Sequence, residues 1–160
     1  MSVKDICNLN VGEIAADDCT LFLWTTFPQI PEALQVIKAW GFQYKTVSFV
    51  WLKQNKSGNG WFFGLGFWTR GNAEICLLAT KGKPHRKSNK VHQFIVSPLR
   101  LHSQKPNEAR EKIVELMGDL PRLELFAREK ADGWDAWGNE VESDVTINSY
   151  SDKTGGGLFV

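Results

Sequence analysis

The stretch LELFAREKADGWDAWGNE, residues 123–140, decides which fold this chain is expected to adopt. Its first residues form an apolar run typical of a buried strand, and the run ends in Arg128. A polar loop follows, and the stretch ends with four closely spaced side chains that are able to bind a ligand: Trp134, Trp137, Asn139 and Glu140. Ligands of α/β sheets bind beyond the carboxyl ends of the strands, so this order predicts a binding site where the strand ends.

Outward from this stretch, expected strands alternate with expected helices. Apolar or alternating runs predict strands at 19–26, 44–53, 73–80, 92–97 and 122–128. Helical periodicity predicts helices over 28–41 and 105–118, and Ser2 with Asp5 predicts a helix cap near the first residue. The apolar stripe of the first long helix consists of Ile30, Ala33 or Leu34, Ile37 and Trp40, and Gly41 ends it. This alternation predicts an α/β fold with a mostly parallel sheet flanked by helices.

The length and composition fit one globular domain. The chain has 160 residues, of which 42% are hydrophobic, and its net charge of +1 gives no overall field toward nucleic acid or membrane. Three cysteines without paired spacing favour a reducing compartment, and no apolar run approaches the roughly 20 residues of a membrane helix. We therefore expect a cytoplasmic protein without a membrane partner. Residues 143–160, which contain a glycine run, are expected to form a flexible C-terminal tail.

Several kinds of chemistry have no matching motif. His85, His92 and His102 are not grouped with cysteines or carboxylates at metal-ligand spacing, so no metal site is expected. The chain has no Gly-x-Ser-x-Gly nucleophile turn and no Walker loop. The run 64–66, Gly-Leu-Gly, is half of a dinucleotide fingerprint without a clean preceding strand, which favours a turn between aromatic segments.

The residues after the last strand suit a nucleoside. A carboxylate such as Glu140 near a strand end can accept both hydroxyls of a ribose, and Arg128 can reach a carboxylate or a sugar oxygen. Asn139 has the donor and acceptor that suit an adenine edge. Lys105, at a helix start, suits a carboxylate. These groups match the adenine, ribose and amino-acid parts of S-adenosylmethionine; the alternative is a surface loop closed by an Arg–Glu pair.

Over residues 1–142 the chain resembles the S-adenosylmethionine-dependent adenine methyltransferases named for the 70 kDa subunit of the mRNA adenosine methyltransferase, whose phage and bacterial members modify DNA. The matching stretches, in order, are LFLWTT, EALQVIKAWGFQYKTVSFVWLKQNKSG, FFGLGFWTRGNAEICLLATKGKP, HSQKPNEAREKIVEL and LELFAREKADGWDAWGNE. The resemblance implies a Rossmann-like methyltransferase domain over 1–142 with permuted motif order, in which the catalytic segment comes first and the cofactor-binding segment last.

The resemblance also implies roles for individual residues. Lys105 would hold the cofactor's carboxylate, Arg128 and Glu140 its ribose and Asn139 its adenine, with Phe126 packed beside it. The substrate side would be lined by Trp51, Lys53, Trp68, Arg70 and Glu74. Glu74 could instead pair with Arg70 to close a loop, and both tryptophans could belong to the core. The basic run of Lys81, Lys83, Arg86, Lys87 and Lys90 is either a solvated loop or a phosphate contact.

One motif of that family is absent from these residues. The family's Asp-Pro-Pro-Trp segment accepts the hydrogens of adenine's amine, but none of the six prolines here follows an aspartate. We therefore assign no catalytic residue and expect the first catalytic strand to be missing. Three explanations are open: a motif encoded upstream, an inactive remnant, or a non-catalytic partner subunit, with the first two favoured.

The expected function is methyl transfer from S-adenosylmethionine to the exocyclic amine of adenine in DNA, with RNA possible as substrate. The chain alone is expected to be inactive, and to self-associate or to take the missing strand from a partner chain, because an unpaired sheet edge is a hazard for solubility. The alternative is a nucleic-acid-binding module without chemistry.

Overall fold

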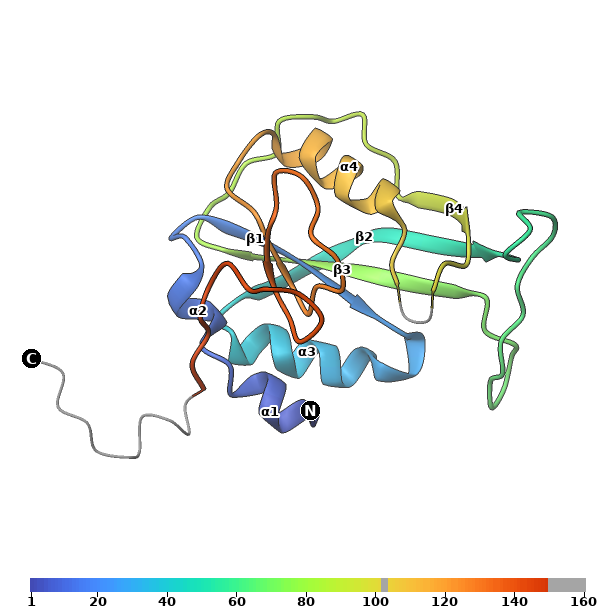
Figure 1. The fold of residues 1–160 in the computed structure, drawn as a ribbon, viewed down its shortest axis with the longest axis horizontal. Helices are drawn as coiled ribbons and strands as arrows, with labels where there is room; N and C mark the ends of the chain where they lie inside the picture. Colours follow the sequence, from blue (N-terminus) through green and yellow to red (C-terminus); the bar gives the residue numbers. More distant parts are fainter. Residues whose placement is uncertain (102–103, 150–160) are drawn as a thin grey trace, which may run out of the picture.

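A four-stranded sheet forms the centre of the structure (Figure 1). The computed structural model describes residues 1–101 and 104–149. The strands are β1 (Cys19–Thr25), β2 (Gln43–Gln54), β3 (Ala73–Lys81) and β4 (Phe94–Pro98), in the order β1-β3-β2-β4. Strand β3 runs antiparallel to β1 and to β2, whereas β2 and β4 are parallel.

The expectation of a mostly parallel sheet is therefore wrong. Strands β1 and β2 do run in the same direction, as strands joined through a helix should, but β3 lies between them. The reason is the connection from β2 to β3, residues 55–72, in which no helix forms. A loop without a crossover helix lets the chain turn back, and β3 consequently pairs antiparallel to β2.

Helices cover both faces of this sheet (Figure 1). Helix α3 (Ile30–Ala39) follows the 3-10 turn η1 (Phe27–Gln29), and α4 (Asn107–Met117) follows β4. Two short helices, α1 (Val3–Cys7) and α2 (Val11–Ile14), precede β1. No helix within residues 1–101 and 104–149 is long and apolar enough to cross a membrane.

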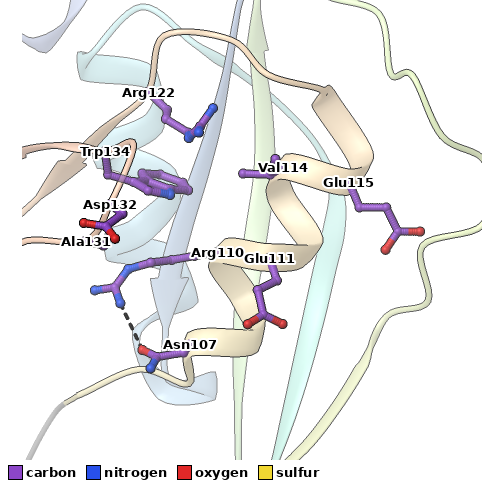
Figure 2. Close-up of a pocket in the computed structure, with 9 residues that line it drawn as sticks. All are labelled: Asn107, Arg110, Glu111, Val114, Glu115, Arg122, Ala131, Asp132 and Trp134. Atoms are coloured by element: carbon purple, nitrogen blue, oxygen red, sulfur yellow. Dashed lines mark hydrogen bonds between the residues drawn. The ribbon is translucent and has the colours of Figure 1, made fainter.

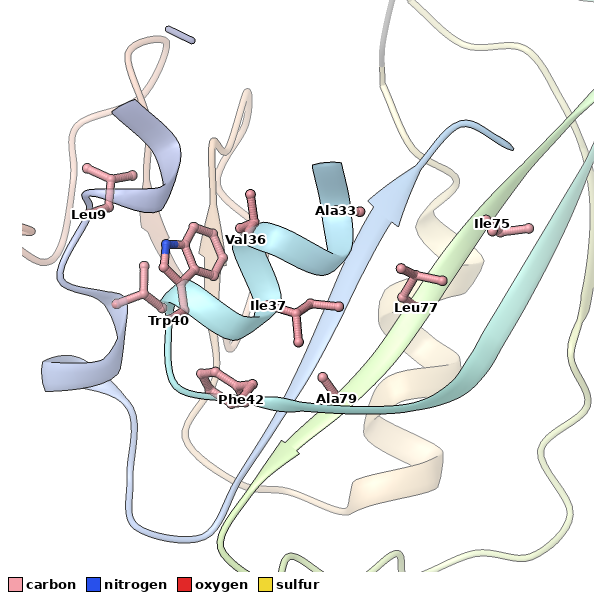
Figure 3. Packing of buried hydrophobic residues seen from close by; sticks show 10 residues of the cluster. Leu9, Ala33, Val36, Ile37, Trp40, Phe42, Ile75, Leu77 and Ala79 are labelled. Atoms are coloured by element: carbon pink, nitrogen blue, oxygen red, sulfur yellow. The ribbon is translucent and has the colours of Figure 1, made fainter. Parts of the chain in front are cut away.

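The core is divided by the alternation of side chains along β3. Ile75, Leu77 and Ala79 face α3 and join a cluster with Ile37 and Trp40 (Figure 3). Cys76 faces the opposite side, in a cluster that includes Phe49 and Ala109 of α4. Burial raises the pKa of the Cys76 thiol to about 12, so it remains a protonated, small apolar group there. The side chains of β3 alternate between the two faces of the sheet, as expected for a buried strand, and thus supply core residues to both.

The ends of the first helices follow the local signals in the sequence. Ser2 and Asp5 form the expected capping box at the start of α1. Gly41 has φ 81° and follows the end of α3, where the amide of Phe42 donates to the carbonyl of Ile37 at 3.0 Å. Trp40 Nε1 donates to the carbonyl of Ile6 at 2.9 Å and so ties α1 to α3.

Strands β5 (Leu123–Leu125) and β6 (Asp135–Trp137) form a separate parallel pair. The strand expected over 122–128 is shorter because Phe126 has φ 58°, a left-handed conformation that ends the extended run. Leu125 and Trp137 pack against the α3 cluster, so this pair is held to the same core as the main sheet.

Residues 143–149, which the sequence assigns to a flexible tail, are tied to the rest of the domain. The amide of Asp144 donates to the carbonyl of Ala136 at 2.8 Å, and its carboxylate accepts from the Ala136 amide at 2.9 Å. The amide of Asn10 donates to the carbonyl of Asn148 at 2.9 Å, and Leu9 forms a β-bridge with Ser149. Residues 150–160 and His102 lie outside the described residues.

Two leucine-sized side chains of α3 give a matched test of this core. Ile37 is 1% exposed and Leu34 is 38% exposed. We expect Ile37→Ala to lower the free energy of unfolding by about 2–5 kcal/mol, because it leaves a cavity in the core. Leu34→Ala should cost under about 1 kcal/mol. Urea denaturation measures both, and equal losses would contradict the assignment of Ala33 rather than Leu34 to the buried stripe.

Candidate functional site

The ends of β5 and β6 lie against each other and form the first part of the site. The amide of Ala127 donates to the carbonyl of Trp137 at 3.0 Å, which joins the two chain segments just beyond the strands. The rings of Phe126 and Trp137 meet edge to face, with centroids 5.3 Å apart and planes at 77°. The left-handed backbone of Phe126 costs about 1–2 kcal/mol in a residue with a Cβ, and such conformations cluster at binding sites.

Gly138 allows this close approach. A Cβ on this residue would lie 2.4 Å from the carbonyl oxygen of Ala127 and 2.8 Å from its amide nitrogen, both closer than real Cβ contacts. Any other residue at 138 would push the end of β6 away from the end of β5. The glycine is therefore required by the shape of the site.

A cavity of about 190 Å³ lies at these strand ends. It is lined by Met1, Phe126, Ala127, Trp137, Gly138, Asn139 and Glu140. Arg128 Nε lies 3.1 Å from the Glu140 carboxylate. The structure thus brings together four of the five predicted cofactor residues, and it places aromatic rings, an amide and a carboxylate around one space. Such a set suits a purine and a sugar diol.

Lys105, the fifth predicted cofactor residue, does not line this cavity. Its ammonium instead donates to Glu74 and lies 5.8 Å from the centroid of the Trp24 ring. Lys105 therefore joins residues that the sequence assigned to the substrate side.

Glu74 is the centre of this second group. Its carboxylate accepts from Lys53 Nζ at 2.6 Å and from Lys105, and its side chain is 13% exposed. Burial by itself raises the pKa of the Glu74 carboxyl, but the hydrogen bonds from Lys105 and Lys53 outweigh burial and hold the pKa below its ordinary value. Glu74 is consequently ionised at neutral pH and fixes two cations beside each other.

Tryptophans support the same group. Lys53 Nζ lies 5.1 Å from the centroid of the Trp51 ring, and the rings of Trp51 and Trp24 meet edge to face at 6.5 Å. Trp51 is 2% exposed, and its Nε1 donates to the carbonyl of Ser97 at 3.1 Å. Trp51 is thus a core residue beneath Lys53, while Trp24 lies beneath Lys105.

The predicted alternative pairing of Glu74 with Arg70 is not the one in the structure. Arg70 donates to the carbonyls of Phe63 and Gly64 at 3.3 and 3.4 Å. Trp68, in contrast to Trp51, is 99% exposed and contributes nothing to the core. The two tryptophans that the sequence could not separate therefore have different roles.

The basic run begins at the opposite end of the sheet. Lys83 comes two residues after Lys81, the last residue of β3, while Glu74 is its second residue. The seven steps from Glu74 to Lys81 cover about 23 Å along the strand. The Lys83 amide donates to Asp18 Oδ1 at 2.7 Å, before β1, and the Lys87 amide donates to the carbonyl of Leu116 at 2.7 Å. The side chains of Lys83, Arg86 and Lys87 are exposed. These cations are not brought together with Lys53 and Glu74.

A larger cavity, of about 600 Å³, was not predicted from the sequence (Figure 2). Residues of α4 line one side, and Arg122 and the 131–134 turn line the other. The Arg122 guanidinium lies 5.7 Å from the centroid of the Trp134 ring. Arg110 donates to Glu124 at 2.8 Å and to Glu129 at 3.2 Å, which ties α4 to β5. Trp134 belongs to the 123–140 stretch, so the sequence did point to it. The ion pairs of Arg110 could not be predicted, because ion pairs between segments distant in the chain have no characteristic local spacing.

Replacing Glu74 tests the ion-pair cluster. Its pKa is lowered by folding from an ordinary value of 4.5, so the cluster stabilises the fold fully above that pH and loses its effect as the pH falls through the folded value. We expect Glu74→Gln to cost about 2 kcal/mol of unfolding free energy at neutral pH, and the difference from wild type to shrink below pH 4.5. Urea denaturation across this range measures it. Glu32→Gln, on the exposed side of α3, is the control, and a pH-independent loss at Glu74 would contradict the assignment.

Comparison with known proteins places the chain in a family. The chain is 37% identical over 143 residues to the Type II methyltransferase M.MunI of Mycoplasma sp, and the alignment covers 88% of this chain and 58% of that protein. It is 29% identical over 151 residues to an N(6)-adenosine-methyltransferase MT-A70-like protein of Arabidopsis thaliana, covering 92% and 22%. The human N(6)-adenosine-methyltransferase catalytic subunit METTL3 is 28% identical over 133 residues, covering 81% and 23%.

This chain therefore spans 58% of the length of the Mycoplasma relative and under a quarter of the other two. The model of the MT-A70 family matches residues 1–140, a range that contains β1 to β6 and both cavities. The chain belongs to the MT-A70 family.

Proposed function

We propose that this chain carries the cofactor and base sites of an enzyme that transfers a methyl group from S-adenosylmethionine to the exocyclic amine of adenine in DNA. The observation that carries the proposal is the cavity at the ends of β5 and β6, where Asn139 and Glu140 face the same space as Phe126 and Trp137. The higher identity to a Type II methyltransferase than to the adenosine methyltransferases supports DNA over RNA.

The residues of the cavity fit the nucleoside part of the cofactor. The Glu140 carboxylate is an acceptor for both ribose hydroxyls, and Arg128, 3.1 Å away, holds that carboxylate in place. Asn139 offers a donor and an acceptor to the adenine edge. Phe126 and Trp137 provide aromatic walls. The cofactor, when bound, supplies a methyl group on a positively charged sulfur.

The Glu74 cluster is proposed to form the substrate side. Lys53 and Lys105 place two ammonium groups around one carboxylate, so the cluster keeps a net positive charge. That charge suits a phosphate of the nucleic acid or the carboxylate of the cofactor. Buried Trp51 supports the cluster from below.

A permuted Rossmann-like order follows from this assignment. The cofactor cavity is formed by β5 and β6, the last strands in the described sequence, whereas the Glu74 cluster is formed by β2 and β3. In an unpermuted domain of this type the cofactor-binding strand comes first.

We also propose that β1 accepts a further strand, from a second copy or from a partner chain. In the described parts of the chain β1 pairs only with β3, and β5 pairs only with β6, so each has one unpaired edge. An unpaired edge presents amide and carbonyl groups that can bind another strand. Such a strand would bring the Asp-Pro-Pro-Trp motif, which these 160 residues do not contain.

The alternative is a nucleic-acid-binding module without chemistry. The fully exposed Trp68 and the exposed basic run from Lys83 to Lys87 favour nucleic-acid contact independently of the cofactor cavity. The two functions differ in whether the chain binds S-adenosylmethionine or its demethylated product.

Calorimetry with S-adenosylhomocysteine, the demethylated product, tests the cofactor assignment. We expect Glu140→Ala to weaken binding by about 1–3 kcal/mol, because the ribose loses a charged hydrogen-bond partner. Glu142→Ala is the matched control, since it removes the same charge from an exposed position two residues away that does not line the cavity. Equal affinities for the wild type and Glu140→Ala would reject the ribose role.

A methyl-transfer assay tests the inferred inactivity of this chain alone. Adenine's amine is a weak nucleophile until acceptors for its hydrogens direct its lone pair, and these residues contain no Asp-Pro pair to do so. We therefore expect no methylated adenine above background from these 160 residues with single-stranded or duplex DNA. Sedimentation at the same concentrations records whether the chain is a monomer or self-associates. Turnover by the monomer would show that the acceptor lies within this sequence.

A further inference from the structure

The connection between β2 and β3 exposes an unusual amount of apolar surface. Residues 61–70, here called the aromatic loop, contain five exposed apolar side chains: Trp61, Phe63, Leu65, Phe67 and Trp68. Leu65 is 97% exposed and Trp68 is 99% exposed. The loop projects beyond the end of the sheet, away from both covering helices (Figure 1). Apolar groups gathered at an exposed position mark an interaction surface.

The aromatic loop is fixed by its own hydrogen bonds. The Gly64 amide donates to the carbonyl of Gly71 at 2.7 Å, and Arg70 donates to the carbonyls of Phe63 and Gly64. At Gly66, a Cβ would lie 2.0 Å from the Thr69 carbonyl oxygen, so the turn beside Phe67 can be this tight only with glycine. Phe67 and Trp68 are therefore presented outward by a closed turn.

The base of the loop is joined to the Glu74 cluster through Lys53. The Phe62 amide donates to the Lys53 carbonyl at 3.0 Å, and the Lys53 amide donates to the Asn72 carbonyl at 2.9 Å. The same lysine donates to Glu74 through its side chain. The two ends of the loop are thus held at the residue that lines the proposed substrate side.

The charges of this segment indicate the partner. Residues 53–73 contain Lys53, Lys56 and Arg70 and no aspartate or glutamate. A segment with exposed aromatic rings, neighbouring cations and no acidic residues suits a nucleic acid as partner. Its bases can stack on the rings while its phosphates approach the cations. Paired bases keep their faces inside the duplex, so only unpaired bases can use these rings.

We propose that the aromatic loop binds unpaired bases of a nucleic acid, with Trp68 and Phe67 as stacking platforms beside the Glu74 cluster. The inference deepens the proposed function and rests on it for the choice of nucleic acid as partner. Stacking holds single-stranded or flipped-out nucleotides next to the target adenine, independently of their sequence.

Fluorescence anisotropy with a labelled single-stranded DNA oligonucleotide, and with its duplex, tests this proposal. We expect the wild type to bind the single strand more tightly, and Trp68→Ala to weaken that binding by at least about 5-fold. Trp68→Phe should retain most of it. The dependence of affinity on salt should keep its slope in Trp68→Ala, because stacking neutralises no phosphate. Tyr44→Ala, which removes an aromatic ring that is 43% exposed at the other end of β2, is the control.

Three outcomes overturn the inference. The first is an unchanged single-strand affinity in Trp68→Ala, and the second is an equal loss of affinity in Tyr44→Ala. The third is a dimer, seen by sedimentation without nucleic acid, that Trp68→Ala dissociates while DNA affinity is unchanged; this result assigns the loop to contact between copies. The same titrations with RNA of matching sequence identify which nucleic acid the loop prefers.

Binding of S-adenosylhomocysteine separates this inference from the proposed function. Trp68→Ala should bind it as the wild type does, because Trp68 does not line the cofactor cavity. A wild-type chain that binds single strands through Trp68 but no cofactor supports the loop assignment and contradicts the methyltransferase proposal. A chain that binds cofactor and shows no Trp68-dependent affinity does the reverse.

Discussion

The pairing of β3 with strands on both sides is the constraint on which the rest of the structure depends. β3 is central, so its alternating side chains must supply two cores, with Ile75, Leu77 and Ala79 toward α3 and Cys76 toward α4. Its direction follows from the helix-free loop before it. The same reversal puts the first residues of β3 beside the last residues of β2, which is why Glu74 meets Lys53 across the strand pair.

Local patterns predicted the longer elements, because their causes are local, whereas the short elements α2 and β6 were not predicted. The capping box at Ser2, the glycine stop at Gly41 and the alternation of β3 each depend on residues a few positions apart. Strand order was not predictable in this way, since it depends on which edges meet. The choice between Ala33 and Leu34 likewise needed the sheet, because both lie on or beside the apolar stripe and only the packed partner decides which is buried.

The candidate sites likewise contain some residues that could be placed from the sequence and one that could not. Asn139 and Glu140 follow β6, and Phe126 and Arg128 follow β5, so the parallel pair brings their side chains to one place. The sequence assigned these four residues to one site but predicted a loop where β6 forms. Lys105 could not be placed, because its partner Glu74 is 31 residues away in the chain. Family resemblance assigned this lysine to the cofactor's carboxylate, whereas its nearest anion is the side chain of Glu74.

Lys105 is nevertheless able to contact both Glu74 and the carboxylate of a cofactor. An ammonium carries three donors, and Glu74 takes one of those on Lys105. Glu74 also neutralises only one of its two lysines, so a second anion could approach the cluster without displacing the carboxylate already there. Because Lys53 holds both ends of the aromatic loop through Phe62 and Asn72, an anion bound at the cluster would lie beside that loop. The carboxylate at position 74 thus positions two cations and, through Lys53, the surface on which bases are proposed to stack.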